Sequence, residues 1–207
     1  MQWRINRIQY PVLNLGPGRR IGIWTQGCAI RCKGCINPEL WNSHGGRYVD
    51  VARLAAEVVS LCGSYDGITV TGGEPFDQYR QLVAFCTFIK QQTQMSVFVY
   101  SGHTLDRLLI KFPDRLFTGC IDYLMDGPFV RNLPSDDPLK GSSNQQLYKV
   151  GEEGCMHPEK LDVARRFSFH LSEMNTLFMA GVPRIGEMEQ VSAGLMATGI
   201  NFEDHEV

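Results

Sequence analysis

Three cysteines stand close together in one short segment and constrain this chain more than any other feature. Cys28, Cys32 and Cys35 have the spacing C-x3-C-x2-C and follow directly on an apolar run at 21–24. Thiolates are soft ligands that select iron–sulfur clusters, zinc or copper(I). A [4Fe–4S] cluster held entirely by protein takes four cysteines. The local run supplies three, so a cluster bound here would keep one iron open to an outside ligand.

The remaining cysteines are scattered, and an odd total of seven does not suggest a disulfide framework. In a reducing compartment a tight cysteine group indicates metal binding. Cys62, Cys86 and Cys120 lie in apolar patterns and are expected to be small buried side chains. Cys155 lies in a polar segment that allows exposure. A zinc site, or a cluster closed by Cys155 or His157, stays open as an alternative to the open iron.

Apolar periodicity predicts that strands and helices alternate along the first 125 residues. Strands are expected at 20–25, 66–71, 96–102 and 121–125, and helices at 50–62, 78–93 and 104–110. This alternation with short links is typical of βαβ units around a parallel sheet, with right-handed crossovers. The predicted fold class is therefore α/β, an incomplete (β/α) barrel, whose site lies at the carboxyl ends of the strands.

Two further motifs follow predicted strands and so belong to the same edge of the sheet. Gly72, Gly73 and Glu74 begin a Gly-Gly-Glu-Pro turn after the second strand. Glycines let a backbone approach a ligand without a Cβ in the way, and a carboxylate accepts hydrogen bonds from an ammonium group. Alone, this motif is most often a simple turn. Tyr100 and Ser101 end the third strand at the same edge.

Together these motifs resemble the radical S-adenosylmethionine (SAM) superfamily, in which SAM chelates the fourth iron of the cluster. Most members carry an aromatic residue before the third cysteine, where this chain has Gly34. That departure resembles the activating proteins of anaerobic ribonucleotide reductase, which share the continuation Cys32-Lys-Gly-Cys-Ile-Asn-Pro-Glu-Leu-Trp41. A Gly-Pro-Gly lead-in at 16–18, an Asp-Gly-x-Phe-Val turn at 126–130 and a Gly-Ser-Ser-Asn-Gln run at 141–145 add to the resemblance.

The resemblance implies a chemistry and a set of site residues. The cluster passes one electron to SAM, giving methionine and a 5′-deoxyadenosyl radical that removes hydrogen from a backbone glycine of a large glycyl-radical enzyme. The electron would come from a flavodoxin- or ferredoxin-type donor. The cluster ligands would be Cys28, Cys32 and Cys35, and the SAM-binding residues would be Gly34, Ile36, Gly72, Gly73, Glu74, Tyr100 and Ser101. Relatives often carry Asp at the position of Glu74, and either carboxylate serves.

Two other functions stay open. The same chemistry can serve a different target, such as a modified peptide, a small molecule or another glycyl-radical enzyme, and the long tail of this chain keeps that alternative alive. The second alternative is a non-catalytic iron–sulfur or zinc module for binding or electron transfer. Gly-Gly-Glu at the next strand's end argues against it, because a zinc loop does not require that motif.

Residues 1–150 are predicted to form the partial-barrel domain, and the resemblance stops there. Residues 151–207 are expected to be an extension packed on the same domain: a linker, a hairpin of 167–171 with 176–181, and a helix at 185–197. Arg19 and Arg20 are expected either beside the cofactor's carboxylate or in solvent. The net charge of −2 gives no argument for a nucleic-acid or membrane partner. Without a long apolar run or a signal-peptide core, we expect a cytoplasmic protein.

Overall fold

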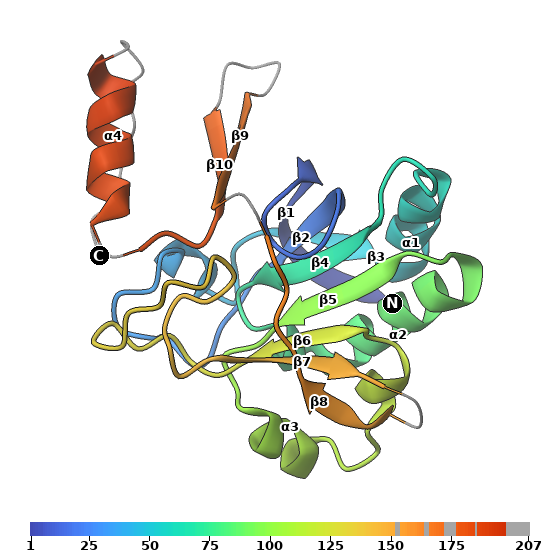
Figure 1. Cartoon of the computed structure of the whole chain (residues 1–207). Helices are drawn as coiled ribbons and strands as arrows, with labels where there is room; N and C mark the ends of the chain where they lie inside the picture. The colour runs from blue at the N-terminus through green and yellow to red at the C-terminus, as the bar shows by residue number, and fades with distance from the viewer. Residues whose placement is uncertain (152–153, 164–165, 172–176, 185, 198–207) are drawn as a thin grey trace.

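The fold is built around one mixed sheet, seen in a computed structural model (Figure 1) that describes residues 1–151, 154–163, 166–171, 177–184 and 186–197. Eight strands form this sheet, in the order β3-β1-β2-β4-β5-β6-β7-β8. Their bounds are β1 (Gln2–Val12), β2 (Arg20–Thr25), β3 (Arg47–Asp50), β4 (Gly67–Gly72), β5 (Ser96–Tyr100), β6 (Tyr123–Asp126), β7 (Gln146–Val150) and β8 (Met156–Pro158).

The parallel centre of the sheet agrees with the sequence. β2, β4, β5 and β6 pair in parallel, and each corresponds to a predicted strand. The predicted α/β class is confirmed. Four antiparallel strands were not predicted: β1 and β3 extend one side, and β7 and β8 extend the other. Among the described strands, β3 and β8 are the edges and the sheet stays open, while a partial barrel stays a prediction.

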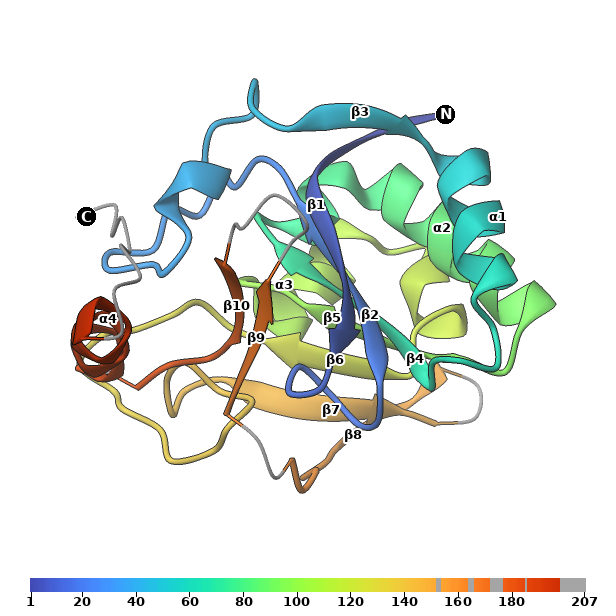
Figure 2. The ribbon, with the colours of Figure 1, turned by 90° about the horizontal axis from the view of Figure 1, so that it is seen from above.

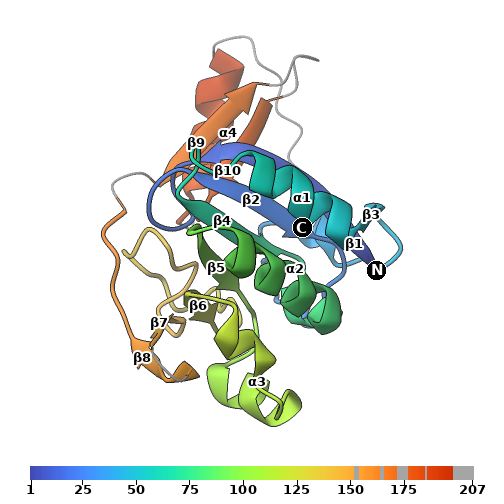
Figure 3. The ribbon, with the colours of Figure 1, turned by 90° about the vertical axis from the view of Figure 1, so that its right-hand side faces the viewer.

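Three helices cover one face of the sheet, as Figure 3 shows, and all three were predicted. They are α1 (Val51–Ser60), α2 (Tyr79–Gln92) and α3 (Leu105–Lys111). Asp50 caps α1 as expected, because its side chain accepts hydrogen bonds from the amides of Ala52 and Arg53. Short 3₁₀ turns are η1 (Pro38–Leu40), η2 (Pro75–Gln78) and η3 (Leu116–Gly119). Among the described helices, none has the length and apolarity to cross a membrane.

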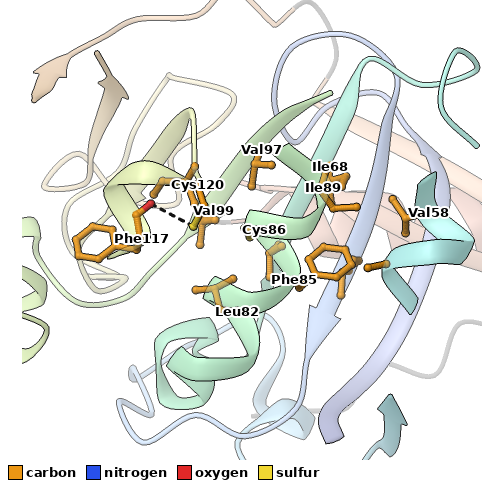
Figure 4. Packing of buried hydrophobic residues seen from close by; sticks show 14 of the residues in the cluster. Val58, Ile68, Leu82, Phe85, Cys86, Ile89, Val97, Val99, Phe117 and Cys120 are labelled. Carbon is orange, nitrogen blue, oxygen red and sulfur yellow. Dashed lines mark hydrogen bonds between the residues drawn. The ribbon is translucent and has the colours of Figure 1, made fainter. Parts of the chain in front are cut away.

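The main hydrophobic core lies between these helices and the sheet. Figure 4 shows part of it, where Cys86 of α2 and Cys120 are buried among apolar side chains and the Cys120 thiol donates to the Phe117 carbonyl at 3.5 Å. Both cysteines were predicted to be buried. The same prediction for Cys62 was wrong: α1 ends at Ser60, so Cys62 falls in the turn beyond the helix and is exposed. Cys155 is exposed, as its polar segment allowed.

Arg20 lies far from the predicted cofactor site. It begins β2, at the opposite end of the strand from the cysteines, and its side chain is fully buried. The guanidinium donates to the Thr69 hydroxyl at 2.6 Å, to the hydroxyl and carbonyl of Ser96, and to the carbonyls of Pro17 and Ile68. Burial lowers its pKa to about 10. Arg20 thus ties the amino ends of three strands together, so the expectation that it would be solvated or lie beside the cofactor was wrong: it is a buried structural residue.

The C-terminal extension packs onto the face of the sheet that the helices leave free. Strands β9 (Phe167–Leu171) and β10 (Leu177–Gly181) form the predicted antiparallel hairpin, whose turn lies outside the described residues. Figures 1 and 2 show the hairpin beside β1 and β2. Phe178 meets Trp24 edge to face at 5.3 Å, and the Arg7 guanidinium lies 4.2 Å from the Phe178 ring. Val163, before the hairpin, is buried in a cluster with Phe98 of β5.

The predicted final helix is α4 (Glu187–Ala197), which has no buried residue and lies away from the sheet in Figure 1. Arg184, just before it, forms a 2.7 Å ion pair with Asp136. The buried contacts of the extension lie in the hairpin and in the segment before it. One side chain of the first loop, Asn14, contacts both.

Replacing Asn14 by Ala should loosen the hairpin selectively. The buried Asn14 amide donates to the carbonyls of Arg166 at 2.8 Å and Ala180 at 2.6 Å. Leaving buried carbonyls unpaired costs about 1–3 kcal/mol. Hydrogen exchange and limited proteolysis should show faster opening of 166–181, with the sheet amides unchanged. Ser168→Ala is the matched control, since it removes a single hydrogen bond to Asn14; equal protection in both variants would contradict this attachment.

Candidate metal and cofactor site

The three clustered cysteines lie in one loop directly after β2, here called the Cys loop (residues 26–37). Cys28, Cys32 and Cys35 are half-buried free thiols. The Cys35 amide donates to the Cys32 carbonyl at 3.1 Å. Two residues with positive φ, Arg31 at 51° and Gly34 at 77°, bend the loop between the cysteines. A tight loop with three accessible thiols is what the sequence predicted.

The start of the Cys loop is fastened to neighbouring segments. The Gly27 amide donates to the Leu40 carbonyl at 2.8 Å, and the Cys28 amide to the Trp41 carbonyl at 3.3 Å. The Ala29 amide donates to the Asp77 carboxylate at 2.9 Å. Sequence reasoning did not single out Asp77, because an Asp in a turn carries no signal of what it will contact. These bonds fix the loop before any metal binds.

The Gly-Gly-Glu turn at the end of β4 lies against the start of the Cys loop. The Glu74 amide donates to the Gly27 carbonyl at 2.8 Å. A Cβ on Gly73 would lie 2.1 Å from that carbonyl oxygen, which is impossible without moving the backbone. Gly72 has φ of 100°, and its Cβ would lie 2.7 Å from the Thr25 amide nitrogen. The structure thus explains both glycines by contact with the chain itself, and a ligand contact stays a prediction.

Glu74 links this turn to the end of β5. Its side chain is 1% exposed and accepts hydrogen bonds from the Phe76 amide at 3.0 Å, the Ser101 hydroxyl at 3.0 Å and the Gly102 amide at 2.8 Å. Burial raises its pKa from 4.5 to about 7, against the opposing effect of those three donors. A carboxylate has about four acceptor positions, so one position is left for a further donor.

Tyr100 and Ser101 lie where the sequence placed them, at the end of β5. Ser101 is buried and bonded to Glu74. The Tyr100 ring lies 4.9 Å from that of Phe98, and its hydroxyl is buried without a hydrogen-bond partner in the described protein. Burial raises the pKa of Tyr100, so the phenol stays protonated. An unpaired buried hydroxyl is costly, and a bound molecule would satisfy it.

Gly34, a predicted site residue in the second half of the Cys loop, lies against the 127–145 loop. The neighbours of Gly34 are Phe129 and Arg131, within 3.4–3.7 Å of where its Cβ would be. Ile36 is 44% exposed. The structure therefore brings the 127–145 loop to the Cys loop, a contact that was not predicted.

Side chains of the polar run at 141–145 hold the 127–145 loop in its conformation. The Gln145 side chain accepts from the amides of Gly141 and Ser142 and donates to the Gly127 carbonyl at 2.9 Å. Asn144 donates to the Pro128 carbonyl at 2.9 Å. The Val130 amide donates to the Ser142 hydroxyl at 3.0 Å. These side chains fold the 127–145 loop that faces Gly34.

The donor set fits a [4Fe–4S] cluster with an additional small ligand. Three half-buried thiols are soft donors of the kind that iron–sulfur clusters require. In the described part of the chain, no three His, Cys, Asp or Glu side chains converge as a single metal ion would need, whereas cluster cysteines each bind a different iron. Glu74 has one acceptor position without a donor, and the buried Tyr100 hydroxyl has no partner among the described residues.

Comparison with known proteins agrees with this geometry. A family model described as a 4Fe-4S single cluster domain matches residues 14–148, most of the chain. This chain belongs to the 4Fe-4S single cluster domain family. The match includes β2, the Cys loop, the Gly-Gly-Glu turn and the ends of β5 and β6, and it stops before the extension.

Among curated proteins, this family member resembles activating enzymes. It is 27% identical over 141 residues to the anaerobic ribonucleoside-triphosphate reductase-activating protein of Enterobacteria phage T4, covering 64% of this chain and 85% of that protein. It is 29% identical over 155 residues to the Pasteurella multocida protein of the same name, covering 70% and 98%. The pyruvate formate-lyase 1-activating enzyme of Escherichia coli K12 is 43% identical over 63 residues, covering 28% and 26%.

Among solved structures, QueE from Escherichia coli has a TM-score of 0.41 and 19% identity, covering 50% of this chain and 54% of that one, a likeness too slight to support a conclusion. The family and the named relatives confirm the predicted membership of the radical SAM activating enzymes. The protein is an enzyme whose cofactors are a [4Fe–4S] cluster and SAM.

Gly73→Ala should prevent the Cys loop from holding its cluster. The added methyl group would require the Gly27 carbonyl to move, at a cost of about 1–3 kcal/mol or more. After anaerobic reconstitution we expect less than half the wild-type iron and sulfide content. Gly119→Ala is the control, because nothing lies within 4 Å of its Cβ position. Normal iron loading of Gly73→Ala would contradict the role assigned to this contact.

Glu74→Gln should alter the pH dependence of stability in the iron-free protein. The pKa of Glu74 rises from 4.5 in the unfolded chain to about 7 in the folded one. The folded state therefore binds this proton more tightly, and the resulting stability is present below pH 4.5 and lost as the pH rises through about 7. Across that window the wild-type free energy of unfolding should fall by up to about 3 kcal/mol relative to Glu74→Gln.

Urea unfolding at a series of pH values measures this difference. Glu57→Gln is the matched control, because the Glu57 side chain is 58% exposed on α1. A difference between wild type and Glu74→Gln that stays constant from pH 4.5 to 8 would show that Glu74 does not titrate as its burial requires.

Proposed function

We propose that this radical SAM enzyme installs a glycyl radical on a large partner enzyme resembling anaerobic ribonucleotide reductase. The observation that carries the proposal is the Cys loop with three half-buried thiols, fastened to the Gly-Gly-Glu turn. The two reductase-activating relatives, each matched over most of its length, support the choice of partner. When bound, the cluster supplies one electron that cleaves SAM and makes hydrogen abstraction from a glycine possible.

The residues of the chain bind and orient the two cofactors. Cys28, Cys32 and Cys35 are the proposed iron ligands. Burial raises the pKa of the Cys28 and Cys32 thiols, and iron binding releases their protons because the ligand is the thiolate. No side chain is required as an acid or base in this chemistry, since the protein contributes binding, orientation and exclusion of water.

The proposed SAM contacts lie on the strand ends beside the Cys loop. Glu74 accepts an ammonium hydrogen of SAM at its remaining acceptor position, and its three internal bonds hold it in place. The Tyr100 hydroxyl takes a polar group of SAM as its missing partner. Gly34, Ile36, Gly72, Gly73 and Ser101 complete the proposed contacts.

Residues 1–150 form the proposed catalytic domain, with 151–207 as an extension on it. Buried Val163 and Ala180 close the free face of the sheet, which keeps water from that side. The seven free cysteines fit a reducing, cytoplasmic setting. The proposed electron donor is a flavodoxin- or ferredoxin-type protein.

A different glycyl-radical enzyme is the second candidate target. The specific observation in its favour is the local match at 43% identity to a pyruvate formate-lyase 1-activating enzyme, over 63 residues. The extension beyond residue 148 also lies outside the family match. Both targets use the same residues at the Cys loop, so the two differ in the protein surface that is recognised.

The decisive experiment is anaerobic reconstitution followed by reduction in the presence of SAM. We expect the wild type to form 5′-deoxyadenosine, and to give a glycyl-radical signal in electron paramagnetic resonance when the reductase is added. Cys28→Ala, Cys32→Ala and Cys35→Ala should each lower product at least about 1000-fold, since each removes a ligand. Cys155→Ala, at an exposed cysteine, is the matched control. Full activity in all three variants would refute the ligand assignment.

A further inference from the structure

Four cationic side chains gather around the Cys loop, and together they are called the basic rim: Arg4, Arg31, Lys33 and Arg131. Arg31 and Lys33 are exposed residues of the loop itself. Arg131 is exposed and lies against Gly34 from the 127–145 loop, and Arg4 comes from β1. The whole chain carries a net charge of −2, so this local excess of positive charge needs its own explanation.

The fold does not use these charges in ion pairs. Among the described residues, no carboxylate lies within ion-pair distance of any member of the basic rim. The nearby carboxylates are engaged elsewhere: Asp77 accepts from the Ala29 amide and pairs with Lys111, Glu39 pairs with Arg7 at 3.7 Å, and Glu74 is buried. Arg4 is half-buried and stacks on the Tyr48 ring, so the exposed positive charge without an ion-pair partner lies on Arg31, Lys33 and Arg131.

A surface pocket of about 450 Å³ adjoins this rim: Arg4 and Arg31 line it, together with one carboxylate, Asp77. It is lined by Cys28, Arg31 and Trp41 on the loop side and by Arg4 and Tyr48 on the side of β1 and β3. The Trp41 indole nitrogen is buried without a hydrogen-bond partner. This pocket reaches Cys28 from the edge of the sheet that carries β3. It leaves free the opposite side of the Cys loop, where Ile30 faces Gly102 at the end of β5.

We propose that the basic rim and its pocket dock the protein that delivers the electron, an acidic one-electron carrier. This rests on the proposed function, which requires one electron from outside for each SAM cleaved. One electron leaves the reduced carrier and enters the oxidised cluster, and no bond is made or broken in that step. Complementary charge speeds such encounters by about 10- to 1000-fold, and electron-transfer contacts are small and transient.

The position of the rim also separates the two partners. The carrier approaches Cys28 beside β1 and β3, whereas the proposed contacts of SAM lie at the ends of β4 and β5. An electron can then enter while the target enzyme is bound. Cations around an anionic cluster have another explanation, which is that they act on the cluster's own potential, and the experiment has to distinguish the two.

The test uses the reconstituted full-length protein and reverses one charge at a time. The variants are Arg31→Asp, which suits the positive φ of 51° at that position, together with Lys33→Glu and Arg131→Glu. Lys149→Glu is the matched control, since Lys149 is exposed on β7, four strands from β2 in the sheet. Stopped-flow absorbance gives the rate of cluster reduction by a reduced flavodoxin of net negative charge, and by reduced methyl viologen, a small cation.

Each rim variant should take electrons from flavodoxin about tenfold more slowly at low salt, with the deficit shrinking at about 0.5 M salt. Reduction by methyl viologen should not slow. The affinity of oxidised flavodoxin for the iron-free protein should fall in parallel, as a readout independent of activity. Lys149→Glu should resemble the wild type in every measurement.

Three results would overturn the inference. Rim variants that match Lys149→Glu show that flavodoxin docks elsewhere. A changed midpoint potential with equal slowing by both reductants shows that the cations act on the cluster. Unchanged flavodoxin affinity with a lost response to the target enzyme assigns the rim to the target. Failure of the proposed function looks different, because methyl viologen then reduces the cluster and no 5′-deoxyadenosine forms.

Discussion

The close approach of two backbones, at Gly27 and Gly73, is the contact on which the site depends. Parallel strands β2 and β4 bring the Cys loop and the Gly-Gly-Glu turn to one edge, but this alone does not fix how they meet. The Glu74 amide bond to the Gly27 carbonyl and the absence of a Cβ at Gly73 fix it. The loop that holds the thiols is therefore positioned by the sheet before iron arrives. Pre-formed positioning of this kind lowers the cost of binding.

Burial and hydrogen bonding extend this order from β4 to β5. Glu74 is the link, since its carboxylate is enclosed and its three donors come from its own turn and from Ser101 and Gly102. Burial raises the pKa of Glu74, while its three hydrogen-bond donors lower it. The net rise shows that burial is the larger effect. The extension acts on the other side, where Asn14 and Trp24 hold the hairpin against the free face. The cationic side chains differ in their surroundings: Arg20 is buried and fully hydrogen-bonded, whereas Arg31, Lys33 and Arg131 of the basic rim are exposed and have no ion-pair partner among the described residues.

The sequence was sufficient for the parallel strands, the helices and the Cys loop, because apolar periodicity and cysteine spacing are local signals. Strands β1, β3, β7 and β8 were not predicted because these antiparallel strands are short or mixed in polarity, and distant residues decide their pairing. The burial of Arg20 was not predicted for the same reason, since its partners Thr69 and Ser96 are distant in the sequence. No local signal in the sequence indicates the contacts that Asp77 and Asn14 make either. The proposed site residues were predicted from motifs, and the structure adds a reason for the two glycines.

The central claim is that three protein thiolates leave one iron free to bind SAM. Electron–nuclear double resonance on the reduced cluster, with SAM labelled with ¹⁵N at its amino group, tests it most directly. The account predicts a ¹⁵N coupling to the cluster and a changed electron paramagnetic resonance spectrum when SAM is added. An unchanged spectrum without nitrogen coupling, in protein that retains a full complement of iron, would contradict it.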